Sequence, residues 1–377
     1  MGTGSLKETV RQKALDMGFD DIGFTGIEPF DLYVREIQSR SAMYDWLNTE
    51  SFNTIRGASP VQKHPWARAI VVLIRSYHKN RFPKELVGKY GRIYQVDERK
   101  IRGEEYHRFL GFLDFLKKQG IESKYDGEIP ARIAASRAGI ATYGKNCFVY
   151  ARKSMNQASW LESLVMVTDA DFEPDTSSLE VACPPDCEMR CMKACPTGAL
   201  YEPLRMNPGK CVAYLSYYGQ ELTPRELREP MGTWMYGCDR CQEACPRNRE
   251  LMKKELPFNE ELQTRMADFD LSVLLRMSQD YYENIVWPQF FYMPKERLDR
   301  WQMNAARALG NLRDPDSVQV LSEALAENPF ENVRAMAAWA LGQIGGQKAR
   351  SALEARREQS QGVVKQEIDL ALDEHWR

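Results

Sequence analysis

Two cysteine-rich segments decide the fold: residues 183–196 read CPPDCEMRCMKACP, residues 238–246 read CDRCQEACP, and Cys211 lies between them. Both segments end in the pattern C-x₃-C-P. In two-cluster ferredoxin-like domains, the early cysteines of a segment bind one [4Fe–4S] cluster and the cysteine before the proline binds the other. Eight cysteines therefore supply two sets of four ligands, with none left over.

This rule predicts which cysteines bind each cluster. The first cluster has the ligands Cys183, Cys187, Cys191 and Cys245, and the second has Cys195, Cys211, Cys238 and Cys241. The first segment departs from the usual C-x₂-C-x₂-C-x₃-C-P spacing, because its first two gaps are each one residue longer, so the role of Cys183 is the most open. Two Cys₄ zinc sites are the alternative. The ninth cysteine, Cys147, is expected to be a small buried side chain.

Composition restricts the class of protein. The 377 residues include 51 basic and 53 acidic side chains, giving a net charge of −2. This balance excludes a generally basic nucleic-acid-binding protein, although not a local basic patch. No apolar run reaches the length of about 18 residues that a membrane helix needs, and the N-terminus lacks a signal-peptide pattern. We therefore expect a cytoplasmic protein, whose reducing compartment disfavours disulfides.

The N-terminal part, residues 1–175, is predicted to be a domain of interleaved strands and helices. Three apolar, β-branched segments are predicted strands: 21–25, 70–74 and 159–168. Residues 104–119 carry apolar side chains at helical spacing. Another helix is predicted between a capping box at residues 5–8 and a C-terminal glycine, Gly18.

The C-terminal part, residues 256–377, is predicted to be helical and repetitive. Residues 308–312 (ALGNL) recur as residues 340–344 (ALGQI), a shift of 32 residues. A helix pair repeated at this period is typical of HEAT-like packing. The segment 176–255 holds the cysteine motifs and shows little apolar periodicity, as in small domains that a bound metal cofactor stabilises.

Two clusters in one chain carry single electrons, and those electrons need an acceptor. A free ferredoxin needs no more than the cluster domain, so the flanking domains indicate either a second cofactor or a carrier with large docking surfaces. No GxGxxG motif follows a strand and no P-loop occurs, so a nucleotide acceptor has no support.

Short stretches along the whole chain occur in the order that they have in one protein family. They are residues 18–24 (GFDDIGF), 102–107 (RGEEYH), 137–140 (RAGI), 144–146 (GKN), 172–175 (FEPD), 236–242 (YGCDRCQ) and 339–342 (WALG). With this ordered set the chain resembles the epoxyqueuosine reductases, which depend on cobalamin and iron–sulfur clusters. The resemblance is equally consistent with a divergent paralogue of these enzymes.

The resemblance implies an α+β multidomain protein. A nitroreductase-like cobalamin-binding domain (1–175) would precede a ferredoxin-like double-cluster domain (176–255) and C-terminal α-helical HEAT-like repeats (256–377). The clusters would pass electrons to cobalamin, and the substrate would be epoxyqueuosine in tRNA. The resemblance further implies a monomer that takes electrons from a low-potential donor of the ferredoxin or flavodoxin type.

The resemblance also implies cofactor-binding residues. They are Glu105, Tyr106, His107, Arg137, Ala138, Gly139, Lys145 and Asn146. Three of these residues have a plainer alternative where the sequence alone is considered. His107 is equally consistent with a core histidine, and Lys145 and Asn146 are equally consistent with a helix-terminating turn.

The proton donor is where the chain departs from the family, which has an aspartate in a D-T-G-[EP] stretch. Residues 124–128 (KYDGE) occupy that place. An ungapped alignment of Gly127 and Glu128 puts Tyr125 at the aspartate position and displaces Asp126 by one. One residue reverses the side-chain direction in an extended segment. Either a bulge lets Asp126 donate, or Tyr125 donates, as in the related cobalamin-dependent reductive dehalogenases, or both are ordinary loop residues.

The substrate is the second open question. Residues 297–377 contain 11 basic and 12 acidic side chains, so composition gives tRNA no independent support. The composition leaves a local basic face open, for example through Arg300, Arg307 and Arg334. The alternatives are a reductase with the same cofactors and a non-tRNA substrate, acting by reductive elimination or dehalogenation, and a non-catalytic iron–sulfur electron carrier.

Overall fold

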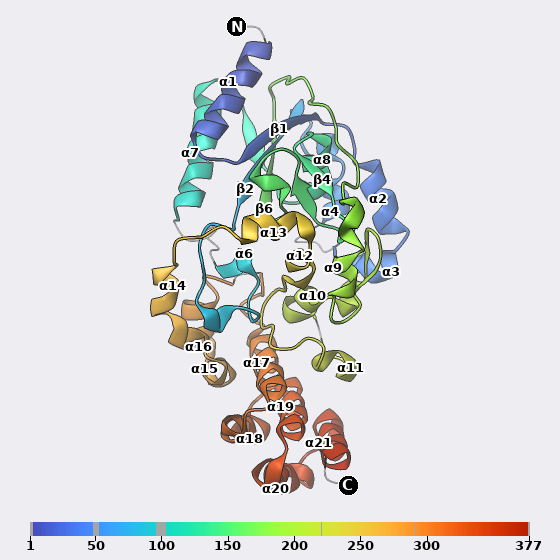
Figure 1. Cartoon of the computed structure of the whole chain (residues 1–377), viewed down its shortest axis with the longest axis vertical. Helices are drawn as coiled ribbons and strands as arrows, with labels where there is room; N and C mark the ends of the chain where they lie inside the picture. Colours follow the sequence, from blue (N-terminus) through green and yellow to red (C-terminus); the bar gives the residue numbers. More distant parts are fainter. Residues whose placement is uncertain (1–2, 48–52, 96–102, 220, 291, 376–377) are drawn as a thin grey trace. The chain divides into compact units, whose positions relative to one another are not determined.

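The computed structural model describes residues 3–47, 53–95, 103–219, 221–290 and 292–375. The chain forms two compact units (Figure 1). The first comprises Met1–Lys79, Glu98–Pro208 and Arg240–Glu255, and the second comprises Asn80–Asp97, Gly209–Asp239 and Leu256–Arg377. The cysteine-rich segment 176–255 therefore contributes residues to both units. The division into domains at 1–175, 176–255 and 256–377 stays a prediction.

The first unit is built on an antiparallel four-stranded sheet with the strand order β1-β2-β6-β3 (Figure 1). Its strands are β1 (Asp21–Gly26), β2 (Ala69–Ser76), β6 (Leu161–Thr168) and β3 (Ser123–Tyr125). The three predicted strands are confirmed. The short strand β3, which the sequence did not reveal, pairs with β6 alone, and its last residue Tyr125 is opposite Met166.

The central strand β2 is buried on both faces of the sheet, which explains its unbroken apolar sequence. Successive side chains alternate between the two faces. Val71 and Leu73 pack with helices α1 (Thr3–Asp16) and α7 (Glu104–Lys118). Ile70 and Val72 pack on the other face, with helix α8 (Ala131–Arg137). The sheet is therefore the middle layer of an α/β unit.

The remaining elements of the first unit are short. They are α2 (Asp31–Gln38), α3 (Ser41–Tyr44), α4 (Thr54–Gly57), α5 (Pro60–Lys63), β4 (Ala141–Tyr143), β5 (Val149–Ala151), α9 (Arg190–Lys193), β7 (Leu200–Glu202), β8 (Arg205–Met206), α12 (Arg240–Glu243) and α13 (Arg249–Met252). Helix α7 confirms the helix predicted at 104–119. The capping box at residues 5–8 is wrong, because α1 already begins at Thr3. Gly18 follows α1 in the left-handed region, at φ +87°.

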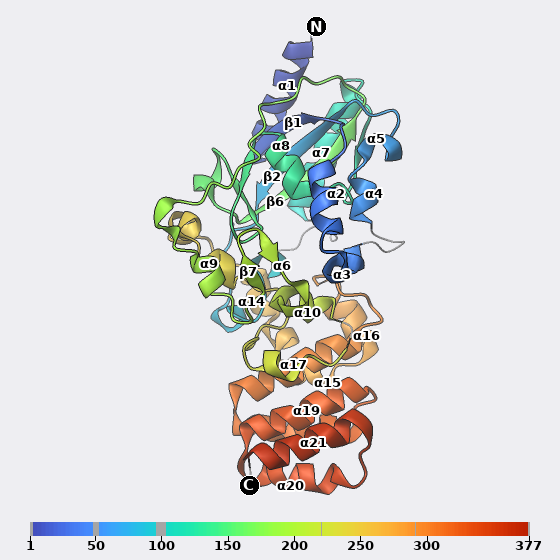
Figure 2. The ribbon, with the colours of Figure 1, turned by 90° about the vertical axis from the view of Figure 1, so that its right-hand side faces the viewer.

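The second unit consists mainly of helices. They are α6 (Arg92–Gln95), α10 (Val212–Tyr217), α11 (Arg225–Arg228), α14 (Glu260–Thr264), α15 (Leu271–Arg276), α16 (Gln279–Tyr281), α17 (Leu298–Leu312), α18 (Val318–Glu327), α19 (Glu331–Ile344), α20 (Gly346–Arg357) and α21 (Gly362–His375). Helices α17, α19 and α21 lie side by side (Figure 2). None of the helices in the described ranges is long and apolar enough to cross a membrane.

The repeated ALGNL and ALGQI motifs form the C-terminal ends of α17 and α19, as the 32-residue period predicts. The surroundings of Gly310 explain why the first copy of the motif needs a glycine. A β-carbon at this position would lie 2.8 Å from the Cα atom of Ala340 and 2.9 Å from the Trp339 ring. The two helices therefore approach most closely where the motif repeats.

Replacing Gly310 by alanine is expected to destabilise the protein by about 1–3 kcal/mol, because backbone of the adjacent helix must move. Gly111 of α7 is the matched control, since a β-carbon there meets no more than the flexible end of Met17, at 3.2 Å. Gly111→Ala is expected to be neutral or stabilising, as alanine favours a helix by about 1 kcal/mol over glycine. Thermal unfolding of the two variants measures the difference, and equal melting temperatures would contradict the close approach.

The polar side of α17 corrects one sequence expectation. Arg300, Asn304 and Arg307 lie at helical spacing and are fully buried. Both Nη atoms of Arg307 donate to the carbonyls of Gly232 and Trp234, and burial lowers the pKa of Arg307 to about 9. The possibility of a basic face through Arg300 and Arg307 is therefore excluded. These guanidinium groups satisfy backbone carbonyls of the loops packed on the helix and are not available to phosphates.

Candidate redox site

The predicted ligands of the first cluster lie close together in the first unit. Cys187 precedes two residues in the left-handed conformation, Glu188 and Met189, and this sharp turn leads into α9, which carries Cys191. Helix α9 contacts α12, the corresponding short helix of the second segment, and Cys245 follows α12 directly. The two C-x₃-C-P segments are thus folded in the same way and packed against each other.

Electrostatics supports this grouping. Burial raises the pKa of Cys191 to about 11, and the nearby Cys187, Cys245 and Cys183 raise it further. Burial and the same neighbours Cys187 and Cys245 raise the pKa of Cys183. Thiolates so placed repel one another unless a cation lies between them, as the iron atoms of a cluster would. This grouping supports the prediction that all four residues, Cys183 included, bind one cluster, and the ligand set stays a prediction.

The second predicted set is divided between the two units. Cys195 and Cys241 belong to the first unit, and Cys211 and Cys238 to the second, so this set stays a prediction. None of the nine cysteines, all within described ranges, forms a disulfide. In the same ranges, no group of three or more histidine, cysteine, aspartate or glutamate side chains is already arranged to hold a metal ion.

The predicted cofactor-binding turn at Lys145 and Asn146 lies against the cysteine segments. The Lys145 backbone N–H donates to Cys183 Sγ at 3.4 Å. The Asn146 Nδ2 donates to the Tyr150 hydroxyl at 2.8 Å and to the carbonyl oxygen of Cys241 at 3.4 Å. This turn is therefore hydrogen-bonded to Cys183, a predicted ligand of the first cluster, and to Cys241, a predicted ligand of the second. Its role toward cobalamin stays a prediction.

Cys147 follows in the same turn and differs from its sequence expectation. It is half-buried and has a left-handed φ of +66°. Its carbonyl oxygen accepts a hydrogen bond from Arg132 Nη1 at 2.9 Å. The backbone of Cys147 thus shapes the turn.

The predicted residues Arg137, Ala138 and Gly139 end α8 and attach it to the sheet. Arg137 donates to the Glu28 carboxylate at 2.9 Å and stacks over the Phe30 ring at 4.3 Å. Ala138 is fully buried. Gly139 has φ +72°, and a β-carbon there would collide with the backbone of the segment that leads to the cysteines. The structure gives these residues a packing role, and their cofactor contacts stay predictions.

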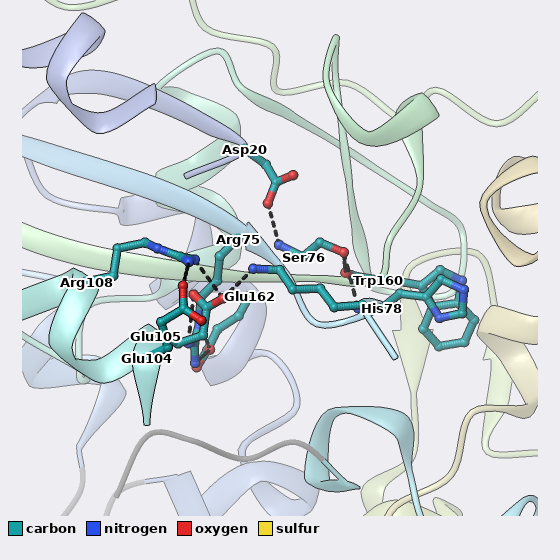
Figure 3. A network of polar contacts seen from close by, with 10 residues as sticks. Asp20, Arg75, Ser76, His78, Glu104, Glu105, Arg108, Trp160 and Glu162 are labelled. Carbon is teal, nitrogen blue, oxygen red and sulfur yellow. Dashed lines mark hydrogen bonds and ion pairs between the residues drawn. The ribbon is translucent and has the colours of Figure 1, made fainter. Parts of the chain in front are cut away.

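The predicted residues Glu105, Tyr106 and His107 lie in the first turn of α7. The Glu105 carboxylate faces Arg75, near the end of β2 (Figure 3). Burial raises the pKa of Glu105, but its hydrogen bond from Lys79 and the nearby Arg108 outweigh burial and hold the pKa below its ordinary value. Tyr106 and His107 are exposed, which excludes a core role for His107. The Glu105 carboxylate is already paired with Lys79, Arg108 and Arg75, and the role of these three predicted residues toward a cofactor stays a prediction.

The two candidate proton donors point in opposite directions. Tyr125 ends the edge strand β3, its side chain is 47% exposed, and its ring packs edge-on against Phe109 of α7. Asp126 is 5% exposed and its backbone N–H donates to Val165. The strand alternation expected from the sequence is therefore present. Phe109, which contacts Tyr125, lies one turn of α7 after Glu105.

Asp126 lies in a buried charge cluster that the sequence did not reveal. Its carboxylate accepts hydrogen bonds from Lys63 Nζ at 2.8 Å and the backbone N–H of Glu128 at 2.9 Å, and it lies 2.7 Å from His64 Nε2. Burial raises the pKa of Asp126, but these hydrogen bonds outweigh it and hold the pKa below its usual range. Asp126 is therefore ionised at neutral pH and is poorly suited to donate a proton.

The same cluster holds Glu128, two residues further on. Its carboxylate binds Arg56 and accepts from Lys63 Nζ at 2.6 Å and from the Asn53 backbone N–H at 3.1 Å. Hydrogen bonding by Arg56, which outweighs burial, lowers the pKa of Glu128 to about 2. We call Lys63, His64, Arg56, Asp126 and Glu128 the loop clamp, because they fix the segment that follows Tyr125.

Fold and site together define a class: iron–sulfur proteins that combine an α/β unit, a double-cluster segment and HEAT repeats. A family model for a 4Fe-4S double cluster binding domain matches residues 183–248, and a model for HEAT repeats matches residues 299–373. The first match decides between clusters and the zinc alternative in favour of two [4Fe–4S] clusters.

Full-length comparisons are more specific. The epoxyqueuosine reductase of Staphylococcus aureus is 28% identical over 387 residues, covering 99% of this chain and 98% of that protein. An epoxyqueuosine reductase solved with an epoxyqueuosine-modified tyrosine tRNA stem loop has a TM-score of 0.79 at 27% identity. The Bacillus subtilis enzyme, solved with its catalytic aspartate loop swung out of the active site, has a TM-score of 0.79 at 28% identity. Both structures are covered to 99%, as is this chain.

This chain belongs to the epoxyqueuosine reductase family of oxidoreductases, whose members depend on cobalamin. The predicted fold class, family and cofactors are thereby confirmed. Membership also favours an enzyme over the electron-carrier alternative. The roles of individual site residues are taken up as proposals.

Proposed function

We propose that the protein reduces epoxyqueuosine in tRNA to queuosine, with electrons that pass through two [4Fe–4S] clusters to cobalamin. Removing the epoxide oxygen takes two electrons and two protons and leaves an alkene and water. The observation that carries this proposal is the similarity to epoxyqueuosine reductases over nearly the whole chain, with the double-cluster match inside it.

Cobalamin, when bound, supplies a strong nucleophile and two-electron reductant at its cobalt. The chain's own residues supply the rest. Lys145 and Asn146 lie between the predicted cluster ligands and the sheet, so this turn is the proposed place for electrons to leave the clusters. Glu105, Tyr106 and His107 offer polar groups at the sheet end. The exposed Tyr125 hydroxyl is the proposed proton donor, because a phenol remains protonated at pH 7.

The loop clamp orients this donor. Asp126 and Glu128 are each bound by at least two donors, so the backbone on the C-terminal side of Tyr125 is fixed from two points. Phe109 fixes the ring itself. Because general acids work only within hydrogen-bond reach of the group they protonate, such anchoring keeps the hydroxyl at one place over the sheet edge.

Replacing Lys63 by glutamine is expected to lower turnover by roughly 10- to 100-fold, because a displacement of about 1 Å at a reacting group costs that much. Lys63 donates to both carboxylates of the clamp, so the substitution loosens both anchors together. Cobalt reduction should be unchanged, since the clamp makes no contact with the cysteines. Unchanged turnover in Lys63→Gln would contradict the positioning role.

A direct experiment tests the proposed function. The protein is reconstituted anaerobically with iron, sulfide and cobalamin, and its visible spectrum is recorded before and after reduction. Conversion of an epoxyqueuosine-modified tRNA stem loop is then measured. Absence of bound corrinoid would contradict the proposal, and bound corrinoid without conversion of the stem loop would favour the second function below.

A second function has its own observation in favour. The donor position carries a tyrosine where the family has an aspartate, and two of the three arginines considered for a basic face are buried. A reductase with the same cofactors and a non-tRNA substrate, acting by reductive elimination, is consistent with both features. Slow conversion of the tRNA stem loop alongside rapid reduction of a small activated halide or epoxide distinguishes this function.

The remaining expectations are also proposals. We propose a cytoplasmic monomer that receives single electrons from a ferredoxin- or flavodoxin-type protein, because the clusters accept one electron at a time.

A further inference from the structure

Arg247 is a partly buried cation close to the predicted first cluster. It follows the last ligand in the sequence Cys245-Pro246-Arg247. Its guanidinium donates to the carbonyl oxygen of Ala182 at 2.9 Å and to Thr142 Oγ1 at 3.0 Å. It also donates to two further carbonyls, those of Gln157 and Ala151. These acceptors are all neutral, and Ala182 is the residue before Cys183.

Tyr150 connects this cation to Cys245. The Arg247 guanidinium lies over the Tyr150 ring, 4.4 Å from its centroid. The Tyr150 hydroxyl accepts from Asn146 Nδ2 at 2.8 Å and is hydrogen-bonded to the Cys245 side chain. Since Asn146 supplies its own hydrogen, the tyrosine hydrogen is available to the sulfur. Two cysteines of the set, Cys183 and Cys245, therefore have Arg247 close by.

The charges around Arg247 are unbalanced without a cluster. The hydrogen-bond acceptors named above include no carboxylate. The charges that act on Arg247 include those of Cys245, Cys183 and Glu180. A partly buried guanidinium without a carboxylate partner is stabilised by a nearby anion, and an anionic cluster bound by four thiolates is the counter-ion that this position would meet.

We propose that Arg247 and Tyr150 raise the reduction potential of the first cluster. Reduction adds one electron to an already anionic cluster, so a nearby, partly buried cation stabilises the reduced form more than the oxidised form. A hydrogen bond to a ligand sulfur acts in the same direction. In this proposal Arg247 acts on the cluster through its charge and is not a catalytic residue.

The test is an anaerobic redox titration of the fully loaded protein, followed by electron paramagnetic resonance and resolved into two one-electron steps. Arg247→Gln is expected to shift one midpoint to a more negative potential. The matched control is Arg249→Gln, which removes the same charge two residues away on an exposed position of α13, where water screens it. Arg247→Lys, which keeps the charge, is expected to restore most of the shift.

The outcomes are decisive because loading is checked separately by iron and sulfide analysis. Equal midpoints for Arg247→Gln and Arg249→Gln at full iron content would overturn the proposal. If Arg247→Gln binds less iron, the Tyr150→Phe variant provides the test. This substitution keeps the ring and removes the hydrogen bond to Cys245. An unchanged midpoint potential in Tyr150→Phe would also overturn the proposal. The inference rests on the proposed cluster ligands and not on the substrate, so loss of tRNA activity leaves it intact.

Discussion

Tyr125→Phe is expected to lower substrate turnover by about 10²- to 10⁴-fold, the usual contribution of a positioned general acid. The substitution removes one hydroxyl and keeps the ring that packs against Phe109. Folding, cluster content and reduction of the cobalt should therefore be unchanged. Single-turnover kinetics with pre-reduced protein measures the protonation step apart from electron delivery.

Asp126→Asn is the comparison that gives this result its meaning. The change leaves Lys63 and His64 facing a neutral amide in a buried cluster, which costs about 1–3 kcal/mol of stability. A lower melting temperature with a smaller loss of turnover than Tyr125→Phe is expected. If Asp126→Asn instead abolished turnover at unchanged stability while Tyr125→Phe retained it, the aspartate would be the donor.

Cys191→Ala is expected to abolish multiple turnover completely. Its sulfur lies among the other three predicted ligands of the first cluster, and a [4Fe–4S] cluster needs four ligands. Iron content should fall from about eight to about four atoms per chain, and an external reductant should no longer reduce the cobalt through the clusters. Iron analysis and the visible spectrum report the loss directly.

Two further cysteine variants complete that experiment. Cys183→Ala should lose the same cluster, because Cys183 shares its neighbours with Cys191. Cys147→Ser is the matched control, since this residue lies in a turn outside both segments, and its iron content should be unchanged. Full iron binding by Cys183→Ala would show that the longer spacing of the first segment removes this residue from the ligand set.

Features encoded by short-range patterns could be predicted from the sequence. The apolar run of β2, the helical spacing of α7 and the 32-residue repeat each depend on neighbouring residues alone. The cysteine spacing predicted the double cluster for the same reason. Strand β3 was missed because three residues carry no periodicity. The division of the eight cysteines between the two clusters stays a prediction.

Features created by tertiary contact could not be predicted in this way. Asp126 and Lys63 are 63 residues apart, and nothing local indicates that they meet. The burial of Arg300 and Arg307 was also missed, because a charged residue on a helix is exposed by default. One signal was present: Arg300, Asn304, Arg307 and Asn311 follow each other at intervals of four, three and four, which places them on one helix face.

The opposite orientation of Tyr125 and Asp126 has an evolutionary consequence. Because β3 is three residues long and pairs on one side alone, one residue inserted or deleted beside it exchanges the side chains that face outward and inward. Such a change swaps a phenol for a carboxylate at the proposed donor position and leaves the sheet, the clusters and the helices intact. We therefore expect a single codon gained or lost beside β3 to change which acid faces outward, at the expense of the contacts that Lys63 and His64 make with Asp126.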